Sequence, residues 1–240
     1  MEKKSNPIIF AESFKGGVGK SMVAVTLVEY CKARNIAVSI IDTDKTCPDV
    51  DAIYSGKTPC RCIDLAKVDG GGWIELFDCA ETHDETIIVN MSASSKESMM
   101  KNKHIIANCL SMLKRPLNLF FALGLQRQSV DQLKAALVLF PDANLIVAVK
   151  NLQNGDQDEF FNYDNAKSSG EFADVREIFL PKLHARLSLK VTDDGATISE
   201  MLEGDLLIDR EKDMLKRWIE GVFSEYDGMR EDLKMPQFCV

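Results

Sequence analysis

Residues 14–22, FKGGVGKSM, combine three glycines with two lysines and a serine hydroxyl. The Gly-Lys-Ser step at 19–21 follows a short apolar run and precedes a stretch with helical spacing, which is the context in which a phosphate-binding loop works. Glycines let backbone N–H groups turn toward a phosphate, and the start of the next helix adds the favourable end of its dipole. Lys20 can reach the β- and γ-phosphates of a nucleotide, and the Ser21 hydroxyl can ligate Mg²⁺. The nucleotide-binding residues predicted from this loop are Gly16, Gly17, Val18, Gly19, Lys20, Ser21 and Met22.

Two acidic side chains follow another apolar run. Asp42 and Asp44 come at the end of IIDTD, residues 40–44. Ligands of open α/β sheets bind at the carboxyl ends of the strands, so both carboxylates are placed where they could act on a bound nucleotide. The alternative is a pair of aspartates that only form a turn.

Short apolar runs alternate with helical stretches along the chain. The expected strands are residues 7–11, 36–41, 87–91, 117–123, 145–149 and 178–180, and the clearest helices are residues 21–34, 95–114, 130–140 and 209–226. This alternation predicts an α/β fold with a mostly parallel central sheet flanked by helices. Residues 44–72 and 151–170 are less regular and are expected to be surface loops or short helices. Since no repeat or low-complexity linker interrupts the pattern, residues 1–240 are expected to form a single domain.

The composition limits the class of protein. The chain has 240 residues, a net charge of −8 and seven cysteines. The acidic balance argues against wrapping nucleic acid over the whole surface. The odd number of cysteines, without a secretion signal, predicts reduced thiols and a cytoplasmic location. No apolar run approaches the roughly 20 residues of a membrane span. Residues 209–226 mix acidic and basic side chains on their polar side, so we expect them to pack on the core and not on a membrane.

At the glycine loop the sequence resembles a known family. The general pattern G-x-x-x-x-G-K-[ST] would place its first glycine at Phe14, and the chain instead has KGGVGKS at 15–21. This segment is similar to the deviant Walker A motif of the ParA/MinD ATPases, whose fold is a P-loop NTPase domain. The resemblance implies that Lys15 contacts the phosphates of the partner subunit in a nucleotide-sandwich homodimer. A solvated lysine beside the loop is the alternative. Cations placed around the transferred phosphoryl group stabilise the charge that develops on it.

The same resemblance implies roles for residues outside the loop. Asp44 corresponds to the acid that positions or activates the attacking water, and Asp42 to the acid that supports the Mg²⁺ region. Asn90 stands where the family's Walker B aspartate ends a strand. Its carbonyl oxygen can bind a metal-bound water, but it lacks the negative charge that Mg²⁺ favours. Asn151 corresponds to an asparagine that contacts the adenine edge, and a simple turn residue is the equal alternative.

The resemblance predicts an ATP-binding dimerisation switch with ATP and Mg²⁺ as ligands and a slow ATPase activity. It implies action in plasmid or DNA partition or in conjugative DNA transfer, with a DNA-binding or relaxase protein as partner. Because of Asn90, the alternative is a nucleotide-dependent adaptor that does not hydrolyse ATP and binds a protein partner. A metabolic kinase is disfavoured by Lys15 and by the lack of a substrate-lid motif.

Two weaker signals leave alternatives open. Lys96, Lys103 and Lys114 share one side of a predicted helix, with Lys101 and Arg115 nearby, and such a face either contacts DNA phosphates non-specifically or is merely solvated.

The cysteines raise the alternative of a zinc site. Cys60 and Cys62 have Cys47, Cys79 and His83 near them in the sequence. Their spacing is not a paired C-x₂-C arrangement, and isolated reduced thiols are the commoner explanation.

Overall fold

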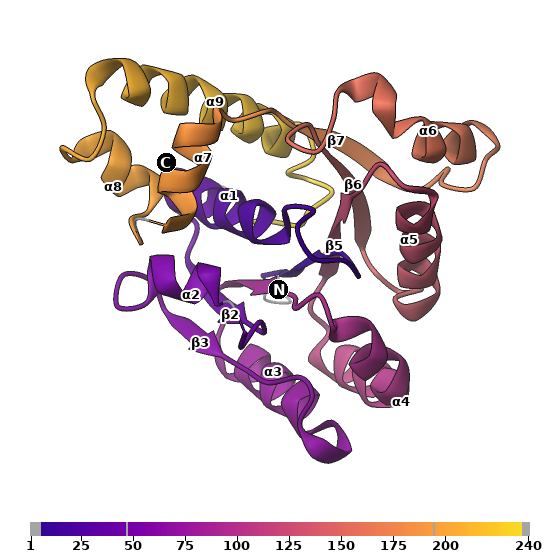
Figure 1. The fold of residues 1–240 in the computed structure, drawn as a ribbon. Helices are drawn as coiled ribbons and strands as arrows, with labels where there is room; N and C mark the ends of the chain where they lie inside the picture. Colours follow the sequence, from indigo (N-terminus) through magenta and orange to yellow (C-terminus); the bar gives the residue numbers. More distant parts are fainter. Residues whose placement is uncertain (1–5, 47, 194, 237–240) are drawn as a thin grey trace.

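A parallel sheet forms the centre of the protein. The computed structural model describes residues 6–46, 48–193 and 195–236. In these residues seven strands pair in the order β3-β2-β4-β1-β5-β6-β7, and every pair is parallel (Figure 1). The carboxyl ends of all strands therefore lie at one edge. The strands are β1 (Ile8–Glu12), β2 (Val38–Asp42), β3 (Cys60–Cys62), β4 (Thr86–Asn90), β5 (Leu117–Leu123), β6 (Leu145–Asn151) and β7 (Arg176–Leu180).

Helices connect the strands, as the alternating pattern predicts. The irregular stretches at 44–72 and 151–170 contain short helices, and the first also contributes the edge strand β3. Three residues are too few to show a strand period, so β3 could not be recognised from the sequence. The α-helices are α1 (Lys20–Ala33), α2 (Asp49–Tyr54), α3 (Gly71–Thr82), α4 (Ser95–Leu113), α5 (Arg127–Leu139), α6 (Phe161–Ser168), α7 (Ala185–Asp193), α8 (Ile198–Glu203) and α9 (Asp209–Asp227), and the 3₁₀-helices are η1 (Val68–Gly70) and η2 (Gln157–Phe160).

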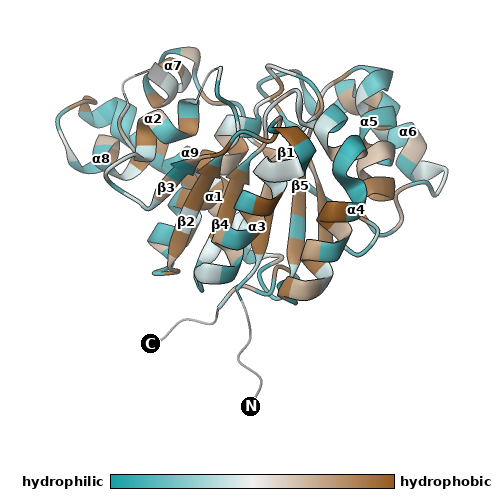
Figure 2. Ribbon diagram, turned by 90° about the horizontal axis from the view of Figure 1, so that it is seen from below, coloured by the Kyte–Doolittle hydropathy of each residue, from teal (hydrophilic) through white to brown (hydrophobic). Residues whose placement is uncertain are grey.

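Two hydrophobic cores lie on opposite faces of the sheet. One packs beneath α1, α2, α7, α8 and α9, and the other beneath α3, α4, α5 and α6. Along β1, Ile9 and Ala11 belong to the first core, and Ile8 and Phe10 belong to the second. Strands buried on both faces read as continuous apolar runs, which explains the run before the glycine loop. Figure 2 shows these apolar strands between helices whose outer sides are hydrophilic.

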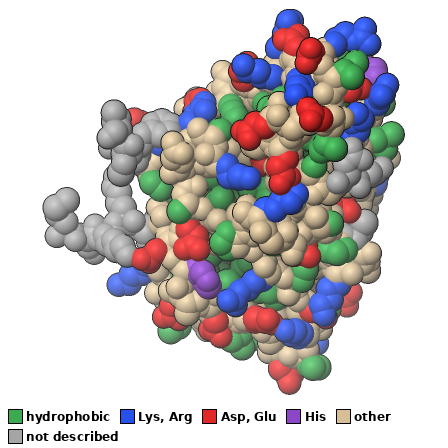
Figure 3. Space-filling view, turned by 90° about the vertical axis from the view of Figure 1, so that its left-hand side faces the viewer, with side chains coloured by type: hydrophobic (Ala, Val, Ile, Leu, Met, Phe, Trp, Pro, Cys, Tyr) green, Lys and Arg blue, Asp and Glu red, His purple; other side chains and the backbone are tan. Residues whose placement is uncertain are grey.

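The last long helix packs on the sheet. Leu215, Ile219 and Val222 of α9 are buried in the core beside α1, as their spacing predicts. On the side of the molecule that carries α2 and α8, basic and acidic side chains are interspersed (Figure 3). Within the described residues no helix is both long and apolar enough to cross a membrane.

Candidate functional site

The glycine loop joins the central strand β1 to α1. Gly17 and Gly19 have φ angles of 74° and 103°, in the left-handed region that glycine adopts without a steric penalty. A Cβ atom at Gly19 would lie 2.2 Å from the side-chain nitrogen of Asn151. Glycine is therefore required at position 19 both for the backbone turn and for the close approach of Asn151.

Two asparagine side chains hold this loop from the end of β6. The Nδ2 atoms of Asn151 and Asn154 each donate to the carbonyl oxygen of Val18, both at 3.0 Å. The Oδ1 atom of Asn151 accepts the backbone N–H of Gln153. Asn151 is thus a support of the loop in this structure, whereas its contact with an adenine edge stays a prediction.

Lys20 lies inside the loop. Its side chain is almost fully buried, and its Nζ atom donates to the carbonyl oxygen of Lys15 at 2.8 Å. Burial lowers the pKa of Lys20, and the negative charges of Glu12 and Asp44 oppose this shift. The loop therefore holds a cation at the point where a phosphate would enter.

A cavity of about 450 Å³ opens beside the loop at the carboxyl edge of the sheet. The predicted residues that line it are Gly16, Gly17, Gly19, Lys20, Ser21, Met22, Asp44, Asn90 and Asn151. Residues near β7, α7 and α9 complete the wall, among them Pro181, Ser188 and Trp218. Asp42, Val18 and Lys15 do not line this cavity. Most of the predicted site is thus brought together in one place.

Asp42 lies behind the cavity wall. Its Oδ1 atom accepts the backbone N–H of Asp44 and the Nδ2–H of Asn90, each at 3.1 Å. Its Oδ2 atom accepts the backbone N–H groups of Val50 and Asp51 at 3.2 and 3.0 Å. Burial raises the pKa of Asp42, while these hydrogen bonds lower it. The carboxylate has two donors at each oxygen, so it orients Asn90 and does not face the cavity itself.

Asn90 presents an unused oxygen at the same edge. Strand register pairs Asn90 with Asp42, and its Nδ2 atom is committed to that carboxylate. Its Oδ1 atom is buried and has no hydrogen-bond partner. Buried polar atoms without a partner are rare and call for an explanation such as an ion or water. Together with the Ser21 hydroxyl in the cavity wall, this oxygen fits the donor set of a hydrated Mg²⁺ ion.

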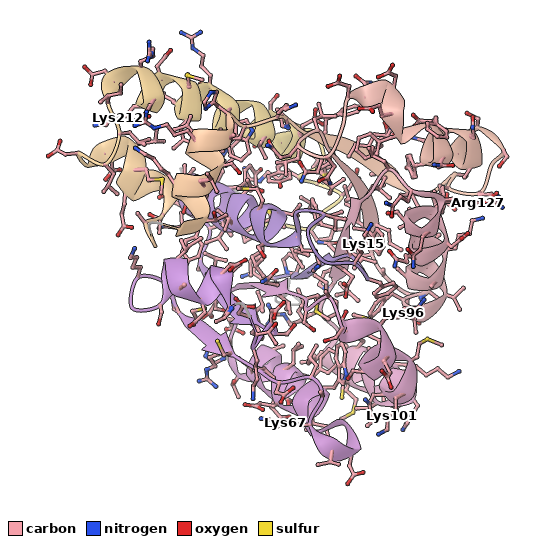
Figure 4. The ribbon with its side chains drawn as sticks, in the orientation of Figure 1. Lys15, Lys67, Lys96, Lys101, Arg127 and Lys212 are labelled. Atoms are coloured by element: carbon pink, nitrogen blue, oxygen red, sulfur yellow. The ribbon has the colours of Figure 1, made fainter. Side chains whose placement is uncertain are left out.

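Asp44 and Lys15 have different surroundings. Asp44 is half-buried in the cavity wall and accepts hydrogen bonds from the backbone N–H and the hydroxyl of Thr46. Lys15 is exposed, and its Nζ atom donates to the Oε1 atom of Gln126, the residue before α5, at 2.5 Å. Figure 4 shows Lys15 at the α5 side of the loop. The side chain of Lys20 therefore lies inside the loop, whereas that of Lys15 points outward to the residue before α5.

The structure also corrects the predicted basic face. Lys101, Lys103 and Lys114 are exposed on α4 or at its end, but Arg115 is buried. The Arg115 guanidinium donates to backbone carbonyl oxygens in the turns before β1 and β4 and at the end of α3. Arg115 is unavailable to DNA because it satisfies the backbone of the core.

The alternative of a zinc site at the cysteines finds no support in the described part of the chain. Among the residues that the structure describes, no three histidine, cysteine or acidic side chains are placed to hold a metal ion. Cys60 and Cys62 lie on the edge strand β3, and the Sγ atom of Cys79 lies 3.7 Å from the Nδ1 atom of His83. Cys47 lies outside the described residues. The cysteines within the described residues are free thiols, namely Cys31, Cys60, Cys62, Cys79 and Cys109.

Sequence reasoning overlooked Glu12. This residue ends β1, directly before the loop, and is fully buried. In the sequence, the signal for this residue is a charged side chain directly between an apolar run and a glycine loop.

Comparisons with known proteins agree with this geometry. A ParA family model, described as the NUBPL iron-transfer P-loop NTPase, matches residues 4–64. Protein MobD of Acidithiobacillus ferrooxidans is 28% identical over 219 residues, which cover 88% of this chain and 95% of MobD. The chain thus has a P-loop NTPase fold and is similar in sequence to proteins of the ParA/MinD family.

Solved structures of ParA/MinD proteins share the fold. The ParA family ATPase from Chlorobium tepidum TLS superimposes with a TM-score of 0.55 at 16% identity, covering 92% of this chain and 100% of that one. A putative plasmid partition protein from Borrelia burgdorferi B31, bound to AMPPNP, gives 0.56 at 14% identity, covering 92% and 99%. The cell division protein MinD of Aquifex aeolicus gives 0.55 at 14% identity, covering 92% and 97%.

Proposed function

We propose that this protein is an ATP-binding dimerisation switch with slow ATPase activity. The observation that carries the proposal is that the two lysines of the loop, Lys15 and Lys20, lie in different surroundings. Lys20 lies in the cavity of its own chain, whereas Lys15 is exposed and turned toward Gln126. A cation that does not serve its own site is available to stabilise phosphate charge across a homodimer.

The cavity residues support ATP and Mg²⁺ as ligands. Lys20 and the loop N–H groups would hold the β- and γ-phosphates, and the Ser21 hydroxyl with Asn90 Oδ1 would hold Mg²⁺ or its waters. Bound Mg²⁺ would neutralise charge that develops on the phosphates. Asp42 supports this region through Asn90, and Asp44 would orient the attacking water. Asn151 keeps the loop closed and stays a candidate for contact with the base.

We infer action in plasmid or DNA partition or in conjugative DNA transfer, in a cytoplasmic setting. Similarity to MobD and to a putative plasmid partition protein supports this inference. The proposed partner is a DNA-binding or relaxase protein. Of the predicted basic face, only the exposed lysines of α4 are proposed to contact DNA non-specifically, because Arg115 is buried.

Asn90 supports one alternative, a nucleotide-dependent adaptor that does not hydrolyse ATP. A neutral amide provides less attraction for Mg²⁺ than a carboxylate. Turnover of ATP by the purified protein with Mg²⁺ separates the two functions. Slow turnover that depends on Mg²⁺ supports the switch, and ATP binding without turnover supports the adaptor.

Lys20→Ala tests the nucleotide site itself. The variant removes the buried cation that would neutralise the phosphates, so we expect at least a hundredfold weaker binding of a fluorescent ATP analogue, in line with the roughly 3 kcal/mol of a charge-assisted contact. Lys101→Ala on the exposed surface of α4 is the matched control and should bind like the wild type. Equal affinity of Lys20→Ala and wild type would remove the loop from the nucleotide site.

A further inference from the structure

A buried carboxylate lies beneath the phosphate loop. Glu12 is the last residue of β1, the central strand, and its side chain has no exposed surface. The loop begins immediately after it, and β1 lies between β4 and β5 in the sheet. Burying a charge costs free energy unless the charge is paired or hydrogen-bonded. A buried glutamate next to the phosphate loop therefore calls for a functional explanation.

Each oxygen of Glu12 has a specific donor. Oε1 accepts the backbone N–H of Ser13 at 2.7 Å, and Oε2 accepts the hydroxyl of Ser95 at 2.8 Å. Ser95 is the buried first residue of α4, which follows the strand that ends in Asn90. These bonds keep the carboxylate in one place beneath the loop.

The charge of Glu12 acts on Lys20. The pKa of Glu12 is raised to about 7, because the effect of burial outweighs the hydrogen bonds from Ser95 and Ser13 and the charge of Lys20, which lower it. The charge of Glu12 is in turn the largest influence that raises the pKa of Lys20. The two groups therefore influence each other through their charges, while Glu12 hydrogen-bonds Ser13 and Ser95 and Lys20 hydrogen-bonds the carbonyl oxygen of Lys15.

The groups around Glu12 are few. Lys20 of α1 is the charged group that acts on it, and Asp44 acts on Lys20 from the end of β2. From α4, Ser95 donates to the carboxylate, and Lys96 lies over the Phe14 ring at 5.6 Å from its centroid. Lys96 is labelled beside α4 in Figure 4.

We propose, resting on the proposed nucleotide site, that Glu12 is a positioning residue that competes with nucleotide phosphates for the charge of Lys20 and so sets the affinity of the loop. A phosphate at the loop is a second anion next to the same cation. Its arrival disfavours the ionised carboxylate, so Glu12 takes a proton from solvent as the nucleotide binds. The protonated oxygen can then donate to the Ser95 hydroxyl, which accepts equally well.

The direction of the pH dependence follows from this proton uptake. The bound state holds more protons than the free state near neutral pH, so affinity rises as the pH falls. The dependence begins near the pH at which Glu12 titrates in the free protein, about 7, and extends up to the higher pKa of Glu12 in the complex. Glutamine keeps the shape and hydrogen-bonding capacity of the side chain but has no charge to lose.

The experiment compares wild type, Glu12→Gln and Glu29→Gln for binding of a fluorescent ATP analogue with excess Mg²⁺ between pH 6 and pH 8. Glu29 is the matched control because it is also buried and accepts from hydroxyl groups, those of Tyr54 and Ser199, but lies on α1 away from the loop. We expect wild-type affinity to fall about fivefold from pH 6 to pH 8, within the tenfold limit that one pKa unit of interaction allows. Glu12→Gln should bind about fivefold more tightly than wild type at pH 8, by the same one-unit shift, and show the same affinity at both pH values. Glu29→Gln should keep the wild-type profile.

A second variant and a second measurement keep the proposal testable if Glu12→Gln does not fold. Ser95→Ala removes a hydrogen bond that favours the ionised carboxylate, so it should move the midpoint of the pH profile upward. Calorimetry of the wild type in two buffers of different ionisation enthalpy should show net proton uptake on binding near pH 7.5.

Equal affinity and equal pH profiles in wild type and Glu12→Gln, with binding still lost in Lys20→Ala, would overturn the role of Glu12 and leave the nucleotide site in place. Absence of nucleotide binding by the wild type would instead overturn the proposed function. For Ser95→Ala, an unchanged midpoint counts against the proposal.

Discussion

At the scale of single residues, the pairing of Asn90 with Asp42 determines what the metal side of the site can do. Asn90 donates through Nδ2 to Asp42 and leaves Oδ1 without a partner in a buried position. An aspartate at position 90 would lose this donor and place two carboxylates side by side. Amide and carboxylate therefore differ here in charge and also in how they fit the neighbouring acid.

Asn90→Asp has two expected effects. Without Mg²⁺ the variant should be less stable by about 1–3 kcal/mol, because a buried hydrogen bond is replaced by repulsion between carboxylates. With Mg²⁺ the added carboxylate should bind the metal region more strongly, so stability should recover and ATP turnover should rise. Thermal unfolding and turnover, each with and without Mg²⁺, measure both effects. A variant that folds but shows no response to Mg²⁺ would place Asn90 outside the metal region.

At the scale of elements, Arg115 connects segments at the amino edge of the sheet. It lies between α4 and β5, and its guanidinium donates to carbonyl oxygens of Asn6, Ala80, His83 and Glu85 at 2.5–2.7 Å. Burial lowers the pKa of Arg115, and nearby acidic charges oppose the shift. One side chain thus satisfies carbonyl groups from the segment before β1, the end of α3 and the segment before β4.

Arg115→Ala should therefore act on folding and not on the nucleotide site. Leaving several buried carbonyl groups without donors costs about 3 kcal/mol or more. Nucleotide affinity of the folded variant should equal that of wild type, since the phosphate loop lies at the opposite edge of the sheet. Denaturant unfolding and nucleotide binding test this, with Lys103→Ala as the control for loss of an exposed cation on α4. If Arg115→Ala is as stable as Lys103→Ala, the guanidinium contacts do not support the fold.

At the scale of the whole molecule, the exposed position of Lys15 bears on assembly. Its amine contacts Gln126 at the start of α5, and the cavity of its own chain is lined by Lys20. In a homodimer that places two cavities face to face, a cation from each chain would offset the charge of the opposite phosphates.

Lys15→Ala should separate nucleotide binding from dimerisation. Lys20, Ser21 and the loop N–H groups stay in place, so a single chain should still bind ATP. The loss of a charge-assisted contact of about 1.5–3 kcal/mol corresponds to a dimer constant weaker by roughly tenfold to a hundredfold. Sedimentation of variant and wild type with ATP and Mg²⁺, beside nucleotide affinity, provides the measurement. Equal dimerisation of both proteins, or a wild type that stays monomeric, contradicts the role of Lys15 in the partner site.

Much of the phosphate site is readable from the sequence because it is local. Residues 15–21 form one strand–loop–helix connection, and the glycines, Lys20 and Ser21 act through contacts within that segment. The α/β class is likewise visible, because strands buried on both faces are short apolar runs and the helices between them keep their own spacing.

Only the tertiary structure decided how distant side chains combine. The strand order places β2 beside β4, and this brings Asp42 to Asn90 across 48 positions of sequence and turns Asp42 away from the cavity. The same long-range packing made Asn151 a support of the loop, Arg115 a buried donor and Ser95 a hydrogen-bond donor to Glu12. Composition and spacing show which groups a chain carries, but hydrogen-bond partners and burial depend on which strands and helices become neighbours.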